Sequence, residues 1–589
     1  MKIANTEAHP TVLLESFSKG EFSQSWRFEG LEKVVAAYTA DDVAGAMQQV
    51  ENAVAAGFHA AGFVSYEAAG GLNPQLSTKQ LADFPLAWFG IFRRRIPVNA
   101  STPEVLQSCR ISTPVIETSQ SDYASKLEQI REAIASGDTY QVNHTTGQRF
   151  EVEGDPFALY RRICRSQQAA FCAWLNIGSQ IILSASPELF FSLKDRQITM
   201  KPMKGTAPRM PVYVDDLMQK QQLTESEKEK AENLMIVDLV RNDLSMISET
   251  GTVTVPRLFE IETYPTVHQM TSTVCARLRP QIGLLEIFRA LFPCGSVTGA
   301  PKRRTMEIIN ELEASPRGIY CGAIGHVSPG GEAVFSVAIR TAVVETDTGK
   351  GHIGIGSGIT WGSDPLEEYR ECLAKGRFLT WEMPDFRLIE SVRYDSSGFW
   401  LLERHLKRLS ESAAYFGFTL PNAEQIRNTL EQLVAGATGT HKLRLLLAQD
   451  GSFTAESESI EAAADVTGMI ALSQYRVSTA DVFLYHKTTR RDIYVSEKAN
   501  HPGCYDVIFL NEMDEVTEGT FNNIVVQLDG HLLTPAVHCG LLPGVFRQEL
   551  LEKGEIREAV ISIETLQQAE KVWLINSVRG WRECKINRY

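Results

Sequence analysis

Hydrophobic residues along this chain alternate between a spacing typical of strands and one typical of helices. Runs rich in β-branched and aromatic residues predict strands at 181–184, 188–193, 333–344, 482–485 and 523–528. Apolar residues three and four apart predict amphipathic helices at 31–55, 122–136, 224–248, 301–313, 365–380 and 403–416. No repeat of fixed period interrupts this mixture. The pattern therefore predicts an α+β fold.

The pattern changes abruptly near Pro384, a residue that stops a helix. The stretch that follows, FRLIESVRYDSSGFW, predicts a new strand and turn. A chain of 589 residues is also too long for one compact core. We therefore predict two domains, 1–383 and 384–589, and divide the first into an amino-terminal part, 1–110, and a catalytic part at about 120–380.

The helix predicted near residue 224 carries a pair of carboxylates. Thr224, followed three residues later by Glu227, is a capping-box pattern that predicts where the helix begins. Glu229 and Glu232 follow at positions i and i+3, so both face one side of the helix.

A second helix repeats this arrangement. Pro365 suits its first turn, and Glu368, Glu371 and Lys375 follow within three turns. Either pair alone is usually a solvated charged face. The alternative is magnesium coordination together with a bound carboxylate substrate, because Mg²⁺ prefers oxygen ligands.

Three glycine-bearing segments lie between these helices, namely SASPE (184–188), PCGSVTGAPK (293–302) and GIGSGI (354–359). Each is by itself a loop signal, although the consecutive N–H groups of Gly356-Ser357-Gly358 suit an anion-binding nest. Arg340 lies inside the apolar run FSVAIRTAVV. A guanidinium that faces inward there needs either an internal salt bridge or a carboxylate ligand.

Charge and composition narrow the classes of partner. A formal charge of −14 and a pI near 5.5 argue against a nucleic acid or an anionic membrane as the main partner. The start of the chain lacks the apolar stretch of a secretory signal, and no later run approaches the length of a membrane span. The ten cysteines are scattered singly without metal-site spacing. We expect a cytoplasmic protein with reduced thiols.

Taken in order, several segments resemble the chorismate-utilising enzyme family over about residues 1–380. They are KGTAPR (204–209), AENLMIVDLVRNDL (231–244), PTVHQMTSTV (265–274), PCGSVTGAPK, IYCGAIG (319–325), AIRTA (338–342) and GSGITWGSDPLEEYRECLAK (356–375). The resemblance implies a β-sandwich core with surrounding helices. It also implies Mg²⁺ held by Glu232 and Glu371 with support from Glu229 and Glu368, and an acid/base role for Glu188 at the departing hydroxyl.

The same resemblance assigns contacts to the chorismate ring or its carboxylates. The residues at these positions are His268, Thr298, Tyr320, Arg340, Gly356, Ser357, Gly358 and Lys375. GSGI stands where many members have GAGI, a change of one hydroxyl.

Lys204 distinguishes the branches of this family, because the anthranilate-forming branch carries a small residue there. The lysine is similar to the nucleophile of the aminodeoxychorismate branch, which must be neutral to attack. A simple charge partner for the substrate is the other interpretation. No nucleophile-elbow cysteine motif for glutamine hydrolysis is visible, so ammonia is expected from solution or from a separate glutamine amidotransferase subunit.

A second group of segments follows residue 386. It comprises the amphipathic stretch WLLERHLKRLSESAAYFGF, HKTTRR (486–491), DEVTEGTFNNIVV (514–526), GLLPGVFRQELL (540–551) and WLINSVRGWREC (573–584). Each is weak alone, but together and in order they resemble the fold-type IV pyridoxal-phosphate enzymes over about 200 residues. The glycine-rich turn that usually opens this family is shortened here, so substrate contacts from that end stay unassigned.

The second resemblance implies pyridoxal 5'-phosphate as cofactor. Lys487 would form the Schiff base and carry the proton, and Glu518 would pair with the pyridine nitrogen and preserve the ring as an electron sink. Asn523 would support the cofactor. The expected phosphate ligands are Arg408, Gly544, Val545, Phe546 and Ser577.

The two resemblances support one another, because the product of the first reaction is the substrate of the second. They imply amination of chorismate to 4-amino-4-deoxychorismate, followed by loss of pyruvate to give 4-aminobenzoate for folate synthesis, with a homodimer possible through the second domain. Two alternatives stay open: an anthranilate-type synthase joined to a branched-chain or D-amino-acid aminotransferase, and a non-catalytic chorismate sensor. Lys204 and Lys487 speak against them.

Overall fold

The computed structural model describes residues 11–18, 20–99, 108–461 and 467–587. Residues 1–10, which belong to the segment examined for a secretory signal, lie outside this description. By its internal contacts the chain forms two compact units, Met1–Pro208 with Lys220–Met383, and Arg209–Gln219 with Pro384–Tyr589. The units divide at Met383 and Pro384. The sequence pattern did not predict that Arg209–Gln219, which interrupts the first unit, groups with the second.

The strands of the first unit form one antiparallel network of two runs that meet at β2. One run is β2-β4-β3-β16-β17-β10-β11-β14, flanked by β12 and β13, and the other is β2-β1-β8-β9-β18-β19-β7. Their bounds are β1 Val12–Glu15, β2 Ser25–Ala37, β3 His59–Val64, β4 Ala87–Val98, β5 Cys109–Ile111, β6 Val115–Ile116, β7 Gln141–Gly154, β8 Phe171–Asn176, β9 Gln180–Ser186, β10 Leu189–Lys194, β11 Gln197–Lys201, β12 Met203–Pro208, β13 Thr254–Thr263, β14 Val267–Arg277, β15 Gly299–Ala300, β16 Ala323–Val327, β17 Ala333–Val337, β18 Thr341–Glu345 and β19 Lys350–Ile359.

A hydrophobic core fills the space between the two runs. It joins Phe63 and Trp88 of one run to Leu175 and Ile182 of the other. Side chains alternate between the faces of a strand, so the residues between these positions point outward, toward the helices. This is the β-sandwich core that the sequence predicted.

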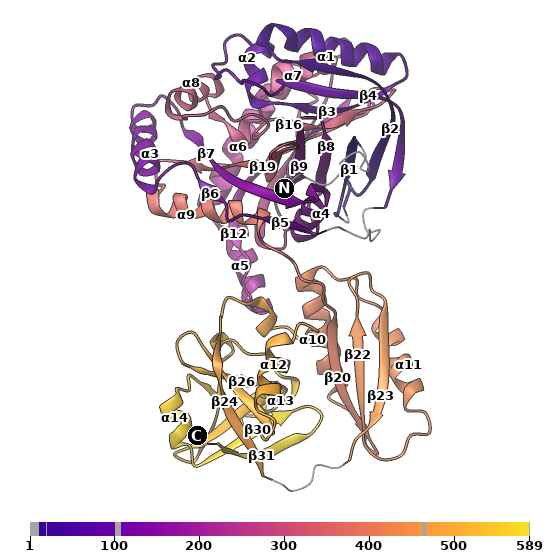
Figure 1. Ribbon diagram of the computed structural model, residues 1–589, viewed down its shortest axis with the longest axis vertical. Coiled ribbons are helices and arrows are strands. Elements are labelled where there is room, and N and C mark those ends of the chain that lie inside the picture. The colour runs from indigo at the N-terminus through magenta and orange to yellow at the C-terminus, as the bar shows by residue number, and fades with distance from the viewer. Residues whose placement is uncertain (1–10, 19, 100–107, 462–466, 588–589) are drawn as a thin grey trace. The chain divides into compact units, whose positions relative to one another are not determined.

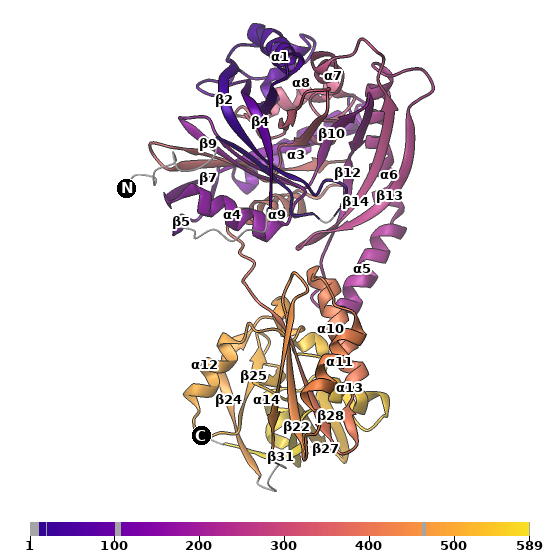
Figure 2. The same cartoon turned by 90° about the vertical axis from the view of Figure 1, so that its right-hand side faces the viewer.

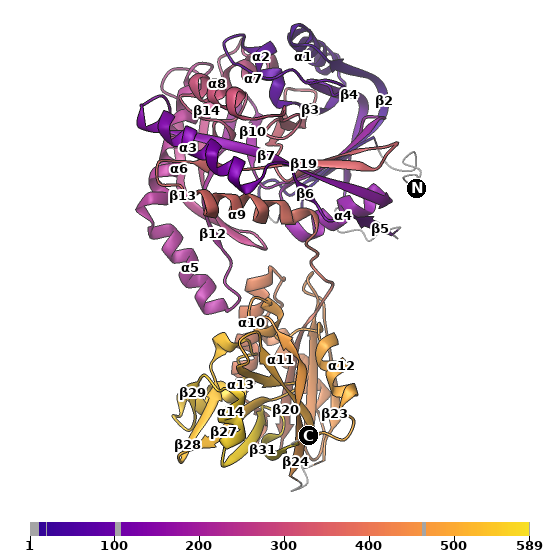
Figure 3. The same cartoon turned by 60° about the vertical axis from the view of Figure 1, so that its left-hand side comes forward.

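Helices cover the outer faces of the sandwich. Their bounds are α1 Ala40–Ala55, α2 Ala69–Leu72, α3 Gln120–Ala135, α4 Pro156–Gln167, α6 Glu227–Ser245, α7 Leu284–Leu291, α8 Lys302–Leu312 and α9 Pro365–Gly376. Helix α5, Tyr213–Glu225, is divided between the two units, because its residues up to Gln219 group with the second. Helices α1, α6 and α7 share a core with the first run, and α3, α4 and α9 share one with the second. Figure 1 shows α1, α2 and α7 together, and Figure 3 shows α3 and α9 beside β7 and β19.

The second unit contains a four-stranded sheet, β21-β20-β22-β23, and an eight-stranded sheet, β26-β25-β24-β31-β30-β27-β28-β29. The strands are β20 Leu388–Asp395, β21 Gly398–Trp400, β22 His441–Leu447, β23 Phe453–Ser459, β24 Gly468–Val477, β25 Asp506–Asn511, β26 Val516–Gly519, β27 Asn523–Leu528, β28 His531–Pro535, β29 Arg557–Ala559, β30 Lys571–Asn576 and β31 Gly580–Ile586. The helices are α10 Leu402–Phe416, α11 Ala423–Leu433, α12 Asp492–Asn500, α13 Val545–Glu552 and α14 Ile563–Gln568. Figure 2 shows α10 and α11 against the smaller sheet.

Some predicted elements were wrong. Residues 31–37 belong to strand β2, because pairing with β4 overrides their helical spacing, and only α1 is helical within 31–55. Residues 482–484 form a 3-10 turn rather than a strand, because the Asp481 side chain accepts a hydrogen bond from the Phe483 N–H.

Two predicted boundaries also moved. Ser226, not Thr224, caps α6, since its side chain accepts from the Glu229 N–H. The predicted strand 333–344 is broken at 338–340, where Arg340 has a φ of 50°.

None of the helices in the described part of the chain combines the length and the apolar character that a membrane crossing needs. The ten cysteines all lie in described residues and are free thiols.

Candidate active sites

The first unit holds a cavity of about 260 Å³ in which both predicted carboxylate pairs meet. Strand β12, helices α6 and α9 and strand β19 supply most of its wall. Residues of this cavity that the sequence predicted are Glu188, Lys204, Glu229, Glu232, Tyr320, Arg340, Gly356, Gly358, Glu368, Glu371 and Lys375. The fold thus gathers segments separated by up to 187 positions, from Glu188 to Lys375, around one space.

Lys204 enters this cavity from β12. Its Nζ lies 3.8 Å from a Glu232 carboxylate oxygen. A Cβ at Gly358 would lie 2.2 Å from the same Nζ, so a side chain there would displace the amine from this position. Burial lowers the pKa of Lys204, and the neighbouring Lys375 adds to this, while Glu232 opposes it. The result is an amine that gives up its proton more readily than a surface lysine.

Glu188 is the buried carboxyl of the cavity. It accepts a hydrogen bond of 2.6 Å from the Ser296 hydroxyl. Burial raises the pKa of Glu188 to about 7, although Ser296 and the nearby Lys204 act in the opposite direction. A carboxyl with this pKa can hold a proton near neutrality and release it, which is the requirement for an acid at a departing hydroxyl.

Arg340 presents a buried guanidinium to the cavity. Its Nη1 donates a 2.7 Å hydrogen bond to the Gln167 side chain. Among the described residues no ion pair includes Arg340, so the internal salt bridge considered from the sequence is not formed. Burial lowers the pKa of Arg340. Its guanidinium is suited to a carboxylate ligand that enters the cavity.

The four glutamates of α6 and α9 crowd the opposite wall. Burial raises the pKa of Glu229, and the negative charges of Glu232 and Glu371 add to the effect. Glu371 pairs with Lys375 at 2.6 Å. In the part of the chain that the structure describes, no three His, Cys, Asp or Glu side chains are close enough together to hold a metal ion. The arrangement is therefore a repelling cluster of oxygen donors.

Three residues expected at the substrate do not line the cavity. His268 lies in β14, with its Nδ1 3.1 Å from the Thr263 hydroxyl. The Thr298 hydroxyl donates a hydrogen bond to the Cys294 carbonyl. Ser357 turns to the other face of β19, where its hydroxyl lies 2.9 Å from that of Tyr123. The expected nest is absent, because Gly356-Ser357-Gly358 is paired with β7 as extended strand.

Sequence reasoning missed two residues near Lys204. Ser296 lies inside the segment PCGSVTGAPK, and its hydroxyl-to-carboxyl contact depends on a fold the sequence does not display. Gln141, at the start of β7, is fully buried, and its amide nitrogen and oxygen have no hydrogen-bond partner. A Cβ at Gly358 would be 2.8 Å from that amide as well as close to Lys204, so amide and amine flank one glycine.

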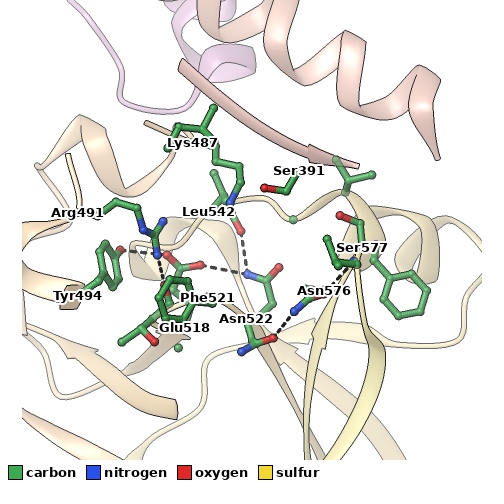
Figure 4. A pocket seen from close by; sticks show the side chains of 18 of the residues that line it. Ser391, Lys487, Arg491, Tyr494, Glu518, Phe521, Asn522, Leu542, Asn576 and Ser577 are labelled. Carbon is green, nitrogen blue, oxygen red and sulfur yellow. Dashed lines mark hydrogen bonds between the residues drawn. The ribbon is translucent and has the colours of Figure 1, made fainter. Parts of the chain in front are cut away.

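The second unit holds a larger cavity, of about 420 Å³. Figure 4 shows Lys487 and Ser391 on one side and Glu518, Phe521 and Asn522 on the other. All the predicted cofactor residues line it: Arg408, Lys487, Glu518, Asn523, Gly544, Val545, Phe546 and Ser577.

Lys487 is held at the edge of β20, because its backbone carbonyl accepts from the Ile389 N–H at 2.9 Å. Burial lowers the pKa of Lys487 to about 7, and the positive charges of Arg491 and Arg408 add to the effect. A neutral amine near pH 7 is what covalent bonding to an aldehyde requires.

Glu518 lies across the cavity on β26. The Tyr494 hydroxyl donates to it at 3.0 Å, and the Asn523 amide at 3.3 Å. Burial raises the pKa of Glu518 to about 7. Asn523 is fixed in turn, since it also donates to the Leu542 carbonyl at 2.9 Å, and a Cβ at Gly544 would lie 1.9 Å from its oxygen.

The start of α13 and the middle of α10 supply the predicted phosphate ligands. Gly544 caps α13 without a side chain, so the first N–H groups of the helix face the cavity. Arg408 donates to Glu390 from Nε and Nη2, at 2.9 and 2.7 Å. These bonds fix the guanidinium and leave Nη1 for a ligand.

Arg491 and Tyr494 are cavity residues that sequence reasoning missed. The Arg491 guanidinium stacks on the Tyr494 ring at 4.8 Å and is the largest charge that counters the raised pKa of Glu518. Lys487 and Arg491 precede helix α12, and Tyr494 lies within it, so helical spacing from Lys487 would not have identified them.

Family models match both halves of the chain. The chorismate binding enzyme model matches residues 98–380, and the amino-transferase class IV model matches residues 387–586. The second match agrees with the lysine, the carboxylate and the helix start found in the larger cavity, and a fold-type IV domain implies pyridoxal phosphate.

Several known proteins are similar to the first half. Aminodeoxychorismate synthase component 1 of Klebsiella aerogenes is 42% identical over 261 residues, which are 44% of this chain and 56% of the relative. The chain thus spans little more than half the length of that relative. Anthranilate synthase component 1 of Methanothermobacter thermautotrophicus is 37% identical over 337 residues, 53% of this chain and 72% of the relative.

The solved structure of anthranilate synthase component I from Streptococcus pneumoniae shares the fold of the first half. It is 24% identical, with a TM-score of 0.53, and covers 61% of this chain and 92% of its own. The chain therefore belongs to the chorismate binding enzyme family, and an amino-transferase class IV domain follows the family's part of the chain.

Proposed function

We propose that the chain aminates chorismate at C4 to give 4-amino-4-deoxychorismate and then removes pyruvate to give 4-aminobenzoate. The observation that carries this proposal is the buried amine of Lys204 in a cavity that it shares with Glu188. A lysine with a lowered pKa in that place supports amination at C4, whereas the anthranilate reaction has no use for it. Similarity to aminodeoxychorismate synthase component 1 supports the same choice.

In the first domain, Lys204 attacks ring carbon C2 and forms a carbon–nitrogen bond. Both ring double bonds shift, the C4–oxygen bond breaks, and the departing hydroxyl takes the proton of Glu188 and leaves as water. Ammonia then bonds to C4, both double bonds shift back, and the bond between Lys204 and C2 breaks. The ammonium formed at C4 returns a proton to the Glu188 carboxylate. Arg340 and Lys375 would bind the substrate carboxylates.

Mg²⁺ would be held by Glu232 and Glu371, with Glu229 and Glu368 in support. The described residues do not bring three such side chains within reach of one ion, so Glu232 and Glu371 would supply two oxygen ligands, and a substrate carboxylate and water would supply the others. The repulsion at Glu229 is what a divalent cation would relieve. The ion would neutralise a carboxylate of chorismate in a cavity that is otherwise rich in negative charge.

In the second domain, the residues fit pyridoxal phosphate: a buried lysine with a lowered pKa, a carboxyl opposite it, and free N–H groups at a helix start. The cofactor would supply an electron sink for the substrate's amino-bearing carbon. Lys487 would remove the C4 proton, and Glu518 would keep the pyridine nitrogen protonated. Loss of pyruvate makes the ring aromatic, which favours release.

Ammonia would come from a separate glutamine amidotransferase subunit. The sequence carries no glutamine-hydrolysing motif, and several of the relatives that match are named as component 1 proteins, which supports a partner.

The test is to incubate the purified protein with chorismate, Mg²⁺, pyridoxal phosphate and ammonium and to separate the aromatic products by chromatography. Wild type should form 4-aminobenzoate. Lys487→Ala should stop at 4-amino-4-deoxychorismate, and Lys204→Ala should make little of either. Anthranilate as the main product would overturn the proposal for the first domain, and accumulation of 4-amino-4-deoxychorismate by wild type would overturn it for the second.

A further inference from the structure

Strands β20 and β22 form one wall of the larger cavity, away from Glu518. Ile389 and Ser391 of β20 line it, and so do Lys442 and Arg444 of β22. These residues are two apart on each strand, so they share a face of the sheet. Ser391 lies directly opposite Arg444 in the antiparallel register. Figure 4 shows Ser391 and Lys487 on the side of the cavity away from Glu518, and both line it.

Positive charge dominates the lining. Among the described residues that line the cavity, the only carboxylate is Glu518. Apart from Lys487, the basic residues there are Arg408, Lys442, Arg444, Arg490, Arg491 and Arg579. The phosphate of the cofactor carries about two negative charges at neutral pH, as phosphate monoesters do. Phosphate and Glu518 together leave several cations unbalanced, so the lining favours a substrate with more than one negative charge.

Three of these cations are already engaged inside the domain. Glu390 holds Arg408, Arg491 donates to the Thr520 carbonyl, and Arg490 stacks on Phe483. Lys442 and Arg444 differ, because their partners are exposed glutamates of β23.

Lys442 lies 3.5 Å from Glu458, and Arg444 lies 3.7 Å from Glu456. Each glutamate side chain is 70% exposed. Such exposed ion pairs contribute little to stability and are screened by solvent. A carboxylate that enters the cavity can therefore replace the two glutamates as the partner of these cations.

We propose that Lys442 and Arg444 form an anion subsite that binds the second carboxylate of a dicarboxylate substrate, and that this subsite selects against ordinary monocarboxylate amino acids. The inference rests on the proposed lyase function of this domain and names its specificity determinants. The planar guanidinium of Arg444 can donate two parallel hydrogen bonds to a carboxylate, and Lys442 adds a positive charge two residues away.

Two variants test the subsite, Arg444→Gln and Lys442→Gln. Arg427→Gln is the matched control. Arg427 of α11 pairs with Glu403 of α10 and does not line the cavity. The apparent KM for 4-amino-4-deoxychorismate should rise about tenfold to a hundredfold in each subsite variant, as expected when a hydrogen bond to a charged group is lost. The control should stay within twofold of wild type.

A second readout does not depend on turnover. Chorismate is a dicarboxylate without the 4-amino group, so it can occupy the subsite without reacting. Titration of chorismate should perturb the visible absorbance of bound pyridoxal phosphate in wild type, and 4-hydroxybenzoate, a monocarboxylate, should do so far more weakly. The Gln variants should lose this difference, and Arg444→Lys should regain part of it.

Equal chorismate titrations in wild type and both Gln variants would overturn the subsite. If wild type releases no 4-aminobenzoate, the proposed lyase function fails, yet the absorbance titration still decides whether the cavity prefers a dicarboxylate. A variant that no longer holds the cofactor is replaced in the comparison by Arg444→Lys, which must then bind chorismate more weakly than wild type and retain the cofactor.

Discussion

Glu390 accepts two hydrogen bonds from the Arg408 guanidinium and lies 2.6 Å from the His405 ring, all inside the second domain. Arg408 and His405 lower the pKa of Glu390 to about 2. The ionised Glu390 therefore stabilises the folded domain at any pH above the ordinary pKa of a glutamate, and this stabilisation is lost as the pH falls toward about 2.

Replacing Glu390 by Ala should destabilise the second domain, because it leaves a buried cation without its partner. Removal of one member of a buried ion pair lowers the free energy of unfolding by about 3–5 kcal/mol. The measurement is urea unfolding followed by loss of the cofactor absorbance. Glu552→Ala is the control, since Glu552 forms an exposed pair with Arg404 and its removal should change stability by less than about 1 kcal/mol. Equal losses in both variants would contradict the expectation.

Glu188 should set an alkaline limb on the first reaction. Its pKa is raised to about 7, and the acid role needs the protonated form, so the rate of chorismate consumption should fall as the pH rises above about 7. Glu188→Gln should lower that rate about 10²- to 10⁴-fold and remove the limb. The measurement is the initial rate with saturating ammonia at each pH, and an unchanged profile in the variant would assign the limb elsewhere.

Lys487 should capture pyridoxal phosphate fastest where its amine is neutral. Its pKa is lowered to about 7, so the rate of covalent capture by cofactor-free protein should rise through pH 7 and then level off. For an ordinary lysine the rate of capture would continue to rise with pH up to the usual lysine pKa, near 10. Stopped-flow absorbance measures this rate. A rate that still increases between pH 8 and pH 10 would show that the amine is not perturbed in this way.

Glu518→Gln should separate cofactor binding from catalysis. An amide fills the same space and keeps the contact with Tyr494, but it cannot hold a proton on the pyridine nitrogen. We expect the variant to retain the cofactor and to lose at least about tenfold in the release of 4-aminobenzoate. Full activity would mean that the carboxyl does not act on the ring.

Gly544→Ala should weaken cofactor binding. The new Cβ would stand 1.9 Å from the Asn523 oxygen, so either Asn523 or the start of α13 must move. Gly503→Ala is a control, because a Cβ there meets nothing within 4 Å. Fluorescence titration with pyridoxal phosphate should show at least a tenfold rise in the dissociation constant for the first variant and no change for the second.

The sequence by itself determined the kinds of element and the ordered motifs. Local patterns determine these features, because the spacing of apolar residues decides which face of a helix or strand is buried. Proline and glycine likewise suit helix starts for local reasons, as Pro365 and Gly544 do here. The lysine and carboxyl of each cavity, Lys204 with Glu188 and Lys487 with Glu518, are present in motifs that can be recognised without coordinates.

Only the tertiary structure decided which side chains meet. Residues 31–37 have helical spacing and yet pair as strand β2, since a partner strand supplies hydrogen bonds that local propensity does not anticipate. Ser357 turns from the cavity because neighbours on a strand point to opposite faces. Gln141, 63 positions before Lys204, lies beside Gly358, as the lysine amine does, an arrangement that only the folded chain creates. The perturbed pKa values at Glu188 and Lys487 follow from burial, which is a property of the packed chain and not of any motif.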